Sequence, residues 1–337
     1  MKTAILGKTG LSCPVLGFGG IPLQRADAEN TVKLVDKLEE YGLTYIDTAR
    51  GYTVSESYLG AALEGRRDKF IIATKSMART YDAMKKDIET SLGNLRTDYI
   101  DLYQIHNIPV DAFDTVFGED GAYKALLEAK EAGKIGHIGF TAHKIESIEK
   151  MIDEYADKVE SVMFPYSIVE NQGAELLSKC RVLGIYTIAM KPMAGGNIDD
   201  WKLAMRYIAN SGVIDVIIPG MGDPVEIERN YEALKDDSPL TQEELDAIEK
   251  IRKDLGSHFC RRCGYCAPCT VGIDIPSAFL FSNYKKKYGL SDWAAGRWAT
   301  LKVNPSECIE CGVCEERCPY ELPIRQMLKD AVELMEK

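Results

Sequence analysis

Short apolar segments alternate with amphipathic helical segments along most of the chain, and this rhythm constrains the fold more than any other feature of the sequence. A short apolar segment bounded by turn residues is typical of a buried strand. Strands that alternate with helices are typical of βαβ units and of a parallel sheet. Eight strands are predicted, and they begin near Val15, Ile46, Phe70, Ile100, His137, Ser161, Ile185 and Val213.

Ionisable side chains stand where several of these strands end. Asp47 lies at the end of the second strand with Tyr52 shortly after it, Lys75 ends the third strand, and His106 follows the fourth. In a barrel of parallel strands the active site lies at the carboxyl ends, so these four residues can meet. Each of them alone is more often structural. The four together, on successive strands, favour a catalytic site.

The chemistry of the four side chains fits together. A phenol has a pKa of about 10 and releases its proton poorly at neutral pH unless a nearby cation stabilises the phenolate. Lys75 can supply that charge, and Asp47 can hold Lys75. The imidazole of His106 can orient a carbonyl oxygen through one N–H.

In order and local context, Asp47, Tyr52, Lys75 and His106 resemble the catalytic Asp-Tyr-Lys-His set of the aldo-keto reductases. The resemblance covers roughly residues 1 to 255. It implies an α/β fold, a (β/α)8 TIM barrel, and an enzyme that reduces a small-molecule carbonyl with hydride from NAD(P)H. Tyr52 would act as the general acid. A predicted hairpin at residues 1–15 would close the bottom of the barrel.

The positions that this resemblance assigns to the nicotinamide depart from the family pattern. Thr141 begins the pair that stands in place of Ser-Asn, Met163 replaces a glutamine, and Met190 replaces a stacking tyrosine. After the last strand, Gly220 and Glu226 replace the Lys and Arg that meet the 2′-phosphate of NADPH. A carboxylate there favours an unphosphorylated ribose. We therefore expect NADH to bind at least as well as NADPH.

Two glycine-rich loops, at residues 193–196 and 219–222, precede predicted helices. Backbone amides at such places can hold phosphate oxygens, although glycine also serves ordinary turns. The predicted cofactor-binding residues are Gly20, Thr141, Met163, Met190, Lys191, Gly195, Pro219, Gly220, Met221, Glu226 and Asn230.

Charge and the N-terminal segment exclude some partners. The net charge of −11 argues against a nucleic-acid or anionic-membrane partner for the chain as a whole. The first apolar run is broken at Lys8 and Gly10, so it is not typical of a secretory or membrane-spanning segment. We expect a cytoplasmic protein.

Cysteine usage divides the chain, because eight of the ten cysteines lie after residue 259. A predicted helix opens with a capping box of Thr241 and Glu244 and ends at Gly256. We predict two domains, the barrel at residues 1–255 and a small domain at residues 256–337. Cys13 and Cys180, outside the small domain, are predicted to be core residues.

The cysteines of the small domain form two runs. The second run has the x2, x2, x3 spacing and following proline of bacterial [4Fe–4S] sites, in which the fourth cysteine binds the neighbouring cluster. That rule gives two crossed sets, Cys260, Cys263, Cys266 and Cys318 for one cluster, and Cys269, Cys308, Cys311 and Cys314 for the other. The first run lacks the x3 spacing and has Thr270 where proline would follow.

Other uses of the cysteines are weaker. Disulfides do not suit a cytoplasmic protein, and structural zinc is the serious rival because its four-cysteine sites also use x2 pairs. The complete second run favours iron. Residues 275–288 and 292–302 are predicted helices, so the small domain resembles an α-helical ferredoxin domain.

Nicotinamide donates two electrons as hydride, whereas each cluster carries one, so direct exchange between them is disfavoured. Three hypotheses follow. The chain is a carbonyl reductase whose clusters are structural or regulatory, or an oxidoreductase in which the clusters feed one-electron steps, or a non-catalytic redox sensor. A flavin would bridge the electron mismatch, but no flavin motif is present. A ferredoxin-like electron carrier would be the partner in the second case.

Overall fold

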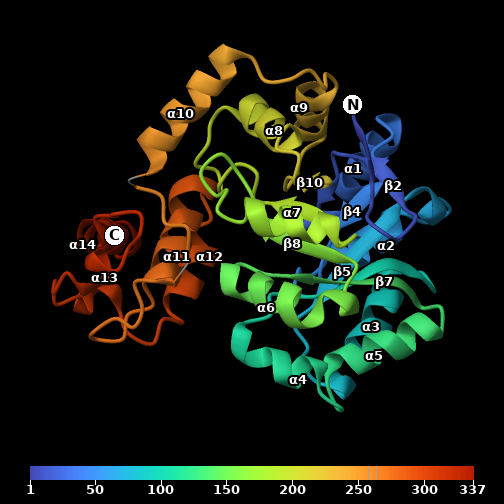
Figure 1. Cartoon of the computed structure of the whole chain (residues 1–337), viewed down its shortest axis with the longest axis horizontal. Helices are drawn as coiled ribbons and strands as arrows, with labels where there is room; N and C mark the ends of the chain where they lie inside the picture. The colour runs from blue at the N-terminus through green and yellow to red at the C-terminus, as the bar shows by residue number, and fades with distance from the viewer. Residues whose placement is uncertain (257, 263) are drawn as a thin grey trace. The chain divides into compact units, whose positions relative to one another are not determined.

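The computed structural model describes residues 1–256, 258–262 and 264–337 (Figure 1). The chain forms two compact units. The first comprises residues Met1–Pro192 and Asp200–Leu240, and the second comprises residues Met193–Asp199 and Thr241–Lys337.

The first unit is built on a parallel sheet that closes on itself. Within the described residues its eight strands are ordered β3 to β10. Backbone bridges from Leu16 to Ile217 and from Gly19 to Gly220 join the first strand to the last. The predicted (β/α)8 barrel is therefore confirmed. The strands are β3 (Phe18–Gly19), β4 (Tyr45–Asp47), β5 (Ile71–Ser76), β6 (Ile100–Ile105), β7 (Ile135–Thr141), β8 (Ser161–Pro165), β9 (Tyr186–Met190) and β10 (Val216–Ile218).

Helices follow the strands and cover the outside of the barrel (Figure 1). The first begins after Asp27, whose carboxylate accepts a hydrogen bond of 2.7 Å from the amide of Asn30. The helices are α1 (Ala28–Glu40), α2 (Ser55–Ala62), α3 (Tyr81–Leu95), α4 (Phe113–Phe117), α5 (Ala122–Glu131), α6 (Ile145–Tyr155), α7 (Ala174–Val182), α8 (Trp201–Ala209) and α9 (Pro224–Leu234). The predicted N-terminal hairpin is formed by β1 (Thr3–Ile5) and β2 (Ser12–Pro14).

The last barrel strand is shorter than the predicted segment at residues 213–218. β10 begins only at Val216. The carboxylate of Asp215 accepts a hydrogen bond of 2.9 Å from the amide of Thr187 and another of 3.0 Å from Arg181. A side chain thus replaces part of the strand ladder at this end.

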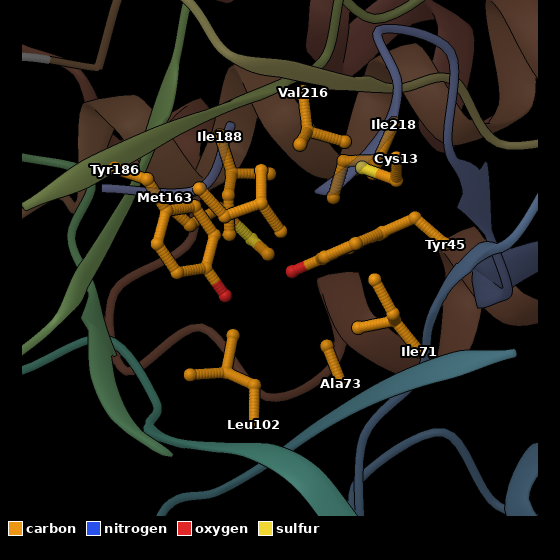
Figure 2. Packing of buried hydrophobic residues seen from close by; sticks show 11 residues of the cluster. Cys13, Tyr45, Ile71, Ala73, Leu102, Met163, Tyr186, Ile188, Val216 and Ile218 are labelled. Atoms are coloured by element: carbon orange, nitrogen blue, oxygen red, sulfur yellow. The ribbon is translucent and has the colours of Figure 1, made fainter. Parts of the chain in front are cut away.

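The barrel interior is filled by side chains of the strands and of the hairpin. Figure 2 shows Met163 and Cys13 among aliphatic side chains, with the hydroxyls of Tyr45 and Tyr186 directed toward one another. Cys13 and, outside this cluster, Cys180 are buried, as predicted for core residues. The interior is a packed core, so the chemistry of this unit belongs at the rim.

The second unit is helical. Its helices are α10 (Gln242–Gly256), α11 (Ile275–Tyr288), α12 (Ser291–Trp298), α13 (Val313–Glu316) and α14 (Ile324–Met335), with the short 3-10 helix η5 (Pro305–Glu307). The predicted capping box is present, since Thr241 and Glu244 exchange hydrogen bonds of 2.9 and 3.2 Å. α12 ends four residues before the predicted Lys302, because Thr300 and Leu301 turn back onto Arg297 and Trp298.

The core of the second unit is small and contains cysteine. Phe279, Trp298 and Leu328 pack there with Cys266 and Cys314, and four further cysteines are partly buried against the same cluster. In the described part of the chain no helix is long and apolar enough to cross a membrane.

Candidate functional site

Three adjacent strands of the barrel bring the predicted catalytic residues together. Asp47 ends β4, Lys75 is the penultimate residue of β5, and His106 directly follows β6. Tyr52 lies in the loop between β4 and α2. Because Asp47 pairs with Ala73 and Lys75 pairs with Gln104, the charged groups reach the same end of the barrel.

Asp47 and Lys75 form a buried ion pair. The ammonium donates a hydrogen bond of 2.6 Å to the Asp47 carboxylate and one of 2.8 Å to the carbonyl of Thr48. The two side chains are 3% and 2% exposed. Burial by itself would lower the pKa of Lys75, but the charges of Asp47 and Tyr52 outweigh burial and raise it. Lys75 is therefore held as a cation at neutral pH.

Tyr52 lies against this cation. Its ring centre is 5.0 Å from the Lys75 nitrogen, and a side-chain hydrogen bond with Tyr52 helps to raise the pKa of Lys75. The rings of Tyr52 and His106 are 6.3 Å apart and nearly perpendicular. A cation beside a phenol favours the phenolate that remains after proton donation.

His106 is a neutral imidazole. Burial, with the charges of Lys75 and Arg79 added, lowers the pKa of His106 to about 3. A guanidinium nitrogen of Arg79 donates to the carbonyls of His106 and Asn107 at 2.7 and 2.8 Å, which fixes the turn. A neutral imidazole can donate one hydrogen bond without adding charge.

Backbone conformation at the rim is unusual. Thr53, Asn107 and Lys191 each have a positive φ, of 43°, 51° and 57°. They directly follow Tyr52, His106 and Met190, three of the predicted site residues. Non-glycine residues adopt this conformation at a cost, and such residues gather at functional sites.

Two residues of the site were not predicted. Gln104 donates a hydrogen bond of 3.4 Å to the second oxygen of Asp47. It lies two residues before His106, so the two-residue period of a strand could have placed both on the barrel interior. Arg79, which holds the turn at His106, lies in a loop, where no sequence pattern distinguishes it from a solvated cation.

Glu56 was also missed. Its carboxylate is buried and accepts hydrogen bonds of 2.8 Å from Arg50, Thr74 and Ser91. Arg50 and Glu56 flank Tyr52, so these bonds tie the Tyr52 loop to β5 and α3. A glutamate in the first turn of a helix carries no sequence signal for such a role.

Several predicted cofactor positions lie at the same rim. The amide of Gly20 donates to the carbonyl of Asp47 at 2.7 Å, and a side chain on Gly20 would collide with that carbonyl. Pro219 and Met221 bond to Gly19 on the neighbouring strand. Thr141 ends β7, and its hydroxyl accepts a 2.7 Å hydrogen bond from Asn107, so it also supports the His106 turn.

Other predicted cofactor positions are placed differently. Met163 is buried in the barrel core (Figure 2), and Met190 is partly buried against it. One oxygen of Glu226 accepts from the amides of Gly222 and Asp223 at 2.6 and 3.1 Å, which caps α9.

The last two cofactor positions occupy different parts of the fold. Asn230 lies buried on α9. Gly195 belongs to the loop at residues 193–199, which is part of the second unit and faces Tyr288.

In the second unit four cysteines surround one small and mostly enclosed cavity. They are Cys269, Cys308, Cys311 and Cys314, which is one of the two predicted crossed sets. None of the four forms a disulfide. A hydrogen bond with Thr270 lowers the pKa of Cys311, which favours the thiolate that binds metals.

The other predicted set is only partly visible. Cys260 and Cys318 are partly buried against the core of the second unit, and Cys266 is buried within it. Cys263 lies outside the described residues.

The spacing of the ligands bears on the choice between zinc and a cluster. Among residues 1–256, 258–262 and 264–337, no three His, Cys, Asp or Glu side chains come close enough to share a single metal ion. Four thiols around one cavity are the ligand set of a four-cysteine zinc site and of a [4Fe–4S] cluster alike, and the x2, x2, x3 run followed by proline is the feature that favours the cluster.

Comparison with known proteins agrees with this geometry. Residues 15–203 match the aldo/keto reductase family, which is more than half of the chain. The chain belongs to the aldo-keto reductase family. Residues 259–323 match the 4Fe-4S dicluster domain. The chain is thus an oxidoreductase of this family that carries a 4Fe-4S domain.

Relatives of this aldo-keto reductase include L-galactose dehydrogenase of Arabidopsis thaliana, 26% identical over 73% of this chain and 92% of that protein. Methylglyoxal reductase DkgA of Yersinia pestis is 30% identical over 72% of this chain and 90% of that protein. The solved structure of aldo-keto reductase AKR11C1 from Bacillus halodurans, in its holo form, aligns with a TM-score of 0.66 at 26% identity. That alignment covers 74% of this chain and 96% of that chain.

Proposed function

We propose that the chain reduces an aldehyde or ketone with NAD(P)H and that Tyr52 is the general acid. The observation that carries this proposal is the buried Lys75–Asp47 pair with the Tyr52 ring 5.0 Å from the ammonium. An intact acid–base set of this kind has no use in a non-catalytic redox sensor.

Each residue has one task in the reaction. His106, neutral, donates a hydrogen bond to the carbonyl oxygen and orients it. When bound, the nicotinamide supplies hydride to the carbonyl carbon. Tyr52 gives its proton to the oxygen that gains charge, and Lys75 stabilises the phenolate left behind. Asp47 keeps Lys75 charged and in place.

At the positions expected to meet a 2′-phosphate, Gly220 has no side chain and the Glu226 carboxylate caps α9. A cavity of about 510 Å³ is lined by Gly222, by the residues just before α1 and by its first turns, and the lining includes Arg25, Asp27, Glu29 and Lys33. Lys33 is paired with Glu29 at 2.8 Å. Two basic and two acidic residues leave this lining without net charge. Arg229 lies over the ring of Trp201. These features support NADH as at least the equal of NADPH.

In the small domain, residues 256–337, we propose two [4Fe–4S] clusters in the crossed cysteine sets. The cavity that Cys269 shares with the second run supports the crossing. We propose a structural role for the clusters, because hydride chemistry needs no one-electron carrier. Cys311 is exposed, which favours the second candidate, a relay from a ferredoxin-like carrier. Turnover supported by reduced ferredoxin and weakened by salt would establish that relay.

The proposal is tested by Tyr52→Phe, which removes the proton donor and little volume. We expect the rate of carbonyl reduction to fall by about 10² to 10⁴ while nucleotide binding, measured by fluorescence titration, stays the same. Tyr99→Phe, a change of the same kind at a half-exposed tyrosine, is the matched control. Full activity of Tyr52→Phe would remove Tyr52 from the mechanism.

A further inference from the structure

The cavity of Cys269, Cys308, Cys311 and Cys314 has two polar neighbours besides its thiols. Most of its remaining lining is apolar or glycine, including Val271, Ile275, Ile309 and Leu328. The polar neighbours are Thr270 and Arg325. The side chain of Arg325 is 42% exposed, so water screens its charge in part, whereas a hydroxyl at hydrogen-bond distance acts on a bound group directly.

Thr270 directly follows Cys269 in the first run and reaches a ligand of the second. Its hydroxyl lies 3.3 Å from the sulfur of Cys311. A thiolate that binds iron has no proton, so only the hydroxyl can donate this hydrogen bond. Thr270 stands where Pro319 follows the last cysteine of the second run, and proline has no such donor.

Arg325 lies near the start of α14 and is held firmly. Its Nε and one terminal nitrogen bind the carboxylate of Glu315 at 2.9 and 2.7 Å, and its amide binds the same carboxylate at 2.8 Å. Gly312 has a φ of 81°, and a side chain there would lie 3.9 Å from the Arg325 guanidinium carbon. The guanidinium is therefore held beside Gly312, between Cys311 and the helix α13 that carries Cys314.

We propose that Thr270 and Arg325 raise the reduction potential of the cluster bound by Cys269, Cys308, Cys311 and Cys314. Reduction adds one electron and no proton to the cluster, so negative charge grows on its sulfurs. The hydroxyl donor stabilises that charge directly, and the Arg325 guanidinium offsets the negative charge that Glu315 would otherwise place beside the cluster. The inference rests on the proposed occupancy of this cysteine set.

The test is a redox titration of anaerobic holoprotein with dithionite, followed by electron paramagnetic resonance. Thr270→Val should shift one of two midpoint potentials to a more negative value and leave the other unchanged. Thr270→Ser keeps the hydroxyl and should restore the native potential. Thr300→Val is the matched control, because the Thr300 hydroxyl donates a hydrogen bond of 2.7 Å to the carbonyl of Arg297 and Thr300 does not line the cavity. Arg325→Gln removes the cation and leaves the Glu315 carboxylate without that partner, so it should shift the same potential as Thr270→Val in the same direction.

The outcomes separate the inference from the proposed function. Full iron content with an unchanged potential in Thr270→Val would overturn the inference alone. Equal shifts of both potentials would also overturn it, because the effect would not be local. A native protein without iron would overturn both the inference and the proposed cluster sites.

Discussion

Replacement of Asp47 by asparagine should leave a buried cation without its counter-ion. Asparagine keeps the volume of the side chain but not the charge that holds Lys75 at 2.6 Å. Removing one partner of a buried ion pair costs about 3–5 kcal/mol, because the other charge stays buried and unpaired. We therefore expect Asp47→Asn to destabilise the barrel.

The upper limit of this loss follows from the lysine itself. Lys75 can escape its unpaired charge by releasing a proton, and at pH 7 that costs a lysine about 5 kcal/mol. The expected loss of about 3–5 kcal/mol therefore stays within this limit. At about 2–4 °C per kcal/mol for a unit of this size, the melting temperature should fall by roughly 6–20 °C.

Trp201 is the one tryptophan in residues 1–255, so its fluorescence can follow the barrel during unfolding in urea. Glu64→Gln is the matched control, because it breaks an ion pair with Arg96 in which the side chains are 59% and 77% exposed. Such a pair contributes about 0–1 kcal/mol. The double variant Asp47→Leu with Lys75→Met should recover most of the stability. A loss below about 1 kcal/mol in Asp47→Asn would refute the reasoning.

Three further predictions follow from the site and the second unit. The pKa of His106 is about 3 in the folded chain against an ordinary value of 6.5, so the unfolded chain takes up this proton first as the pH falls. His106 should therefore not change the free energy of unfolding above pH 6.5 and should lower it progressively as the pH falls from 6.5 toward 3. Urea unfolding should show that the free energy of unfolding of His106→Asn falls by about 3 kcal/mol less than that of the native protein between pH 6.5 and pH 4. An equal fall in both proteins would contradict the buried neutral imidazole. Anaerobic protein should hold about eight iron and eight sulfide per chain, and four iron in the native protein would mean that one site is empty. Cys311→Ala should lose one cluster and make the second unit less stable, which faster proteolysis of that unit would report. Side-by-side titrations should show NADH binding at least as well as NADPH, and a clear preference for NADPH would show that the assignment of Gly220 and Glu226 is wrong.

The barrel could be predicted because its signals are local and repeated. Each strand is a short apolar segment, and Asp47, Lys75 and His106 stand at the ends of three of them, so the fold that aligns the strands also gathers the residues. Element ends were less predictable. Asp215 shortens β10 through a bond to Thr187 that is distant in the sequence, and no local pattern announces it.

The residues that hold the catalytic loops in place act through tertiary contacts, so the sequence alone could not predict them. Glu56 and Arg79 act through bonds to groups that the sequence does not place near them. Cysteine spacing carries more information, because the set that it predicts, Cys269 with Cys308, Cys311 and Cys314, lines one cavity of the second unit, and the binding of a cluster there stays a prediction. The sequence shows Thr270 only as a departure from the proline pattern, because its bond to Cys311 joins residues that are 41 positions apart.

The central claim is that hydride passes from nicotinamide to a carbonyl carbon with Tyr52 as the proton donor. The most direct measurement uses NAD(P)H with deuterium at the transferred position of C4 and a simple aldehyde such as methylglyoxal. The product alcohol is analysed by mass spectrometry and NMR. In a reaction run in ordinary water, the account predicts that the product carries deuterium on its carbinol carbon. It also predicts that the Tyr52→Phe variant forms the same deuterated product more slowly. A product whose carbinol hydrogen comes from solvent would contradict the account and favour a flavin or cluster route.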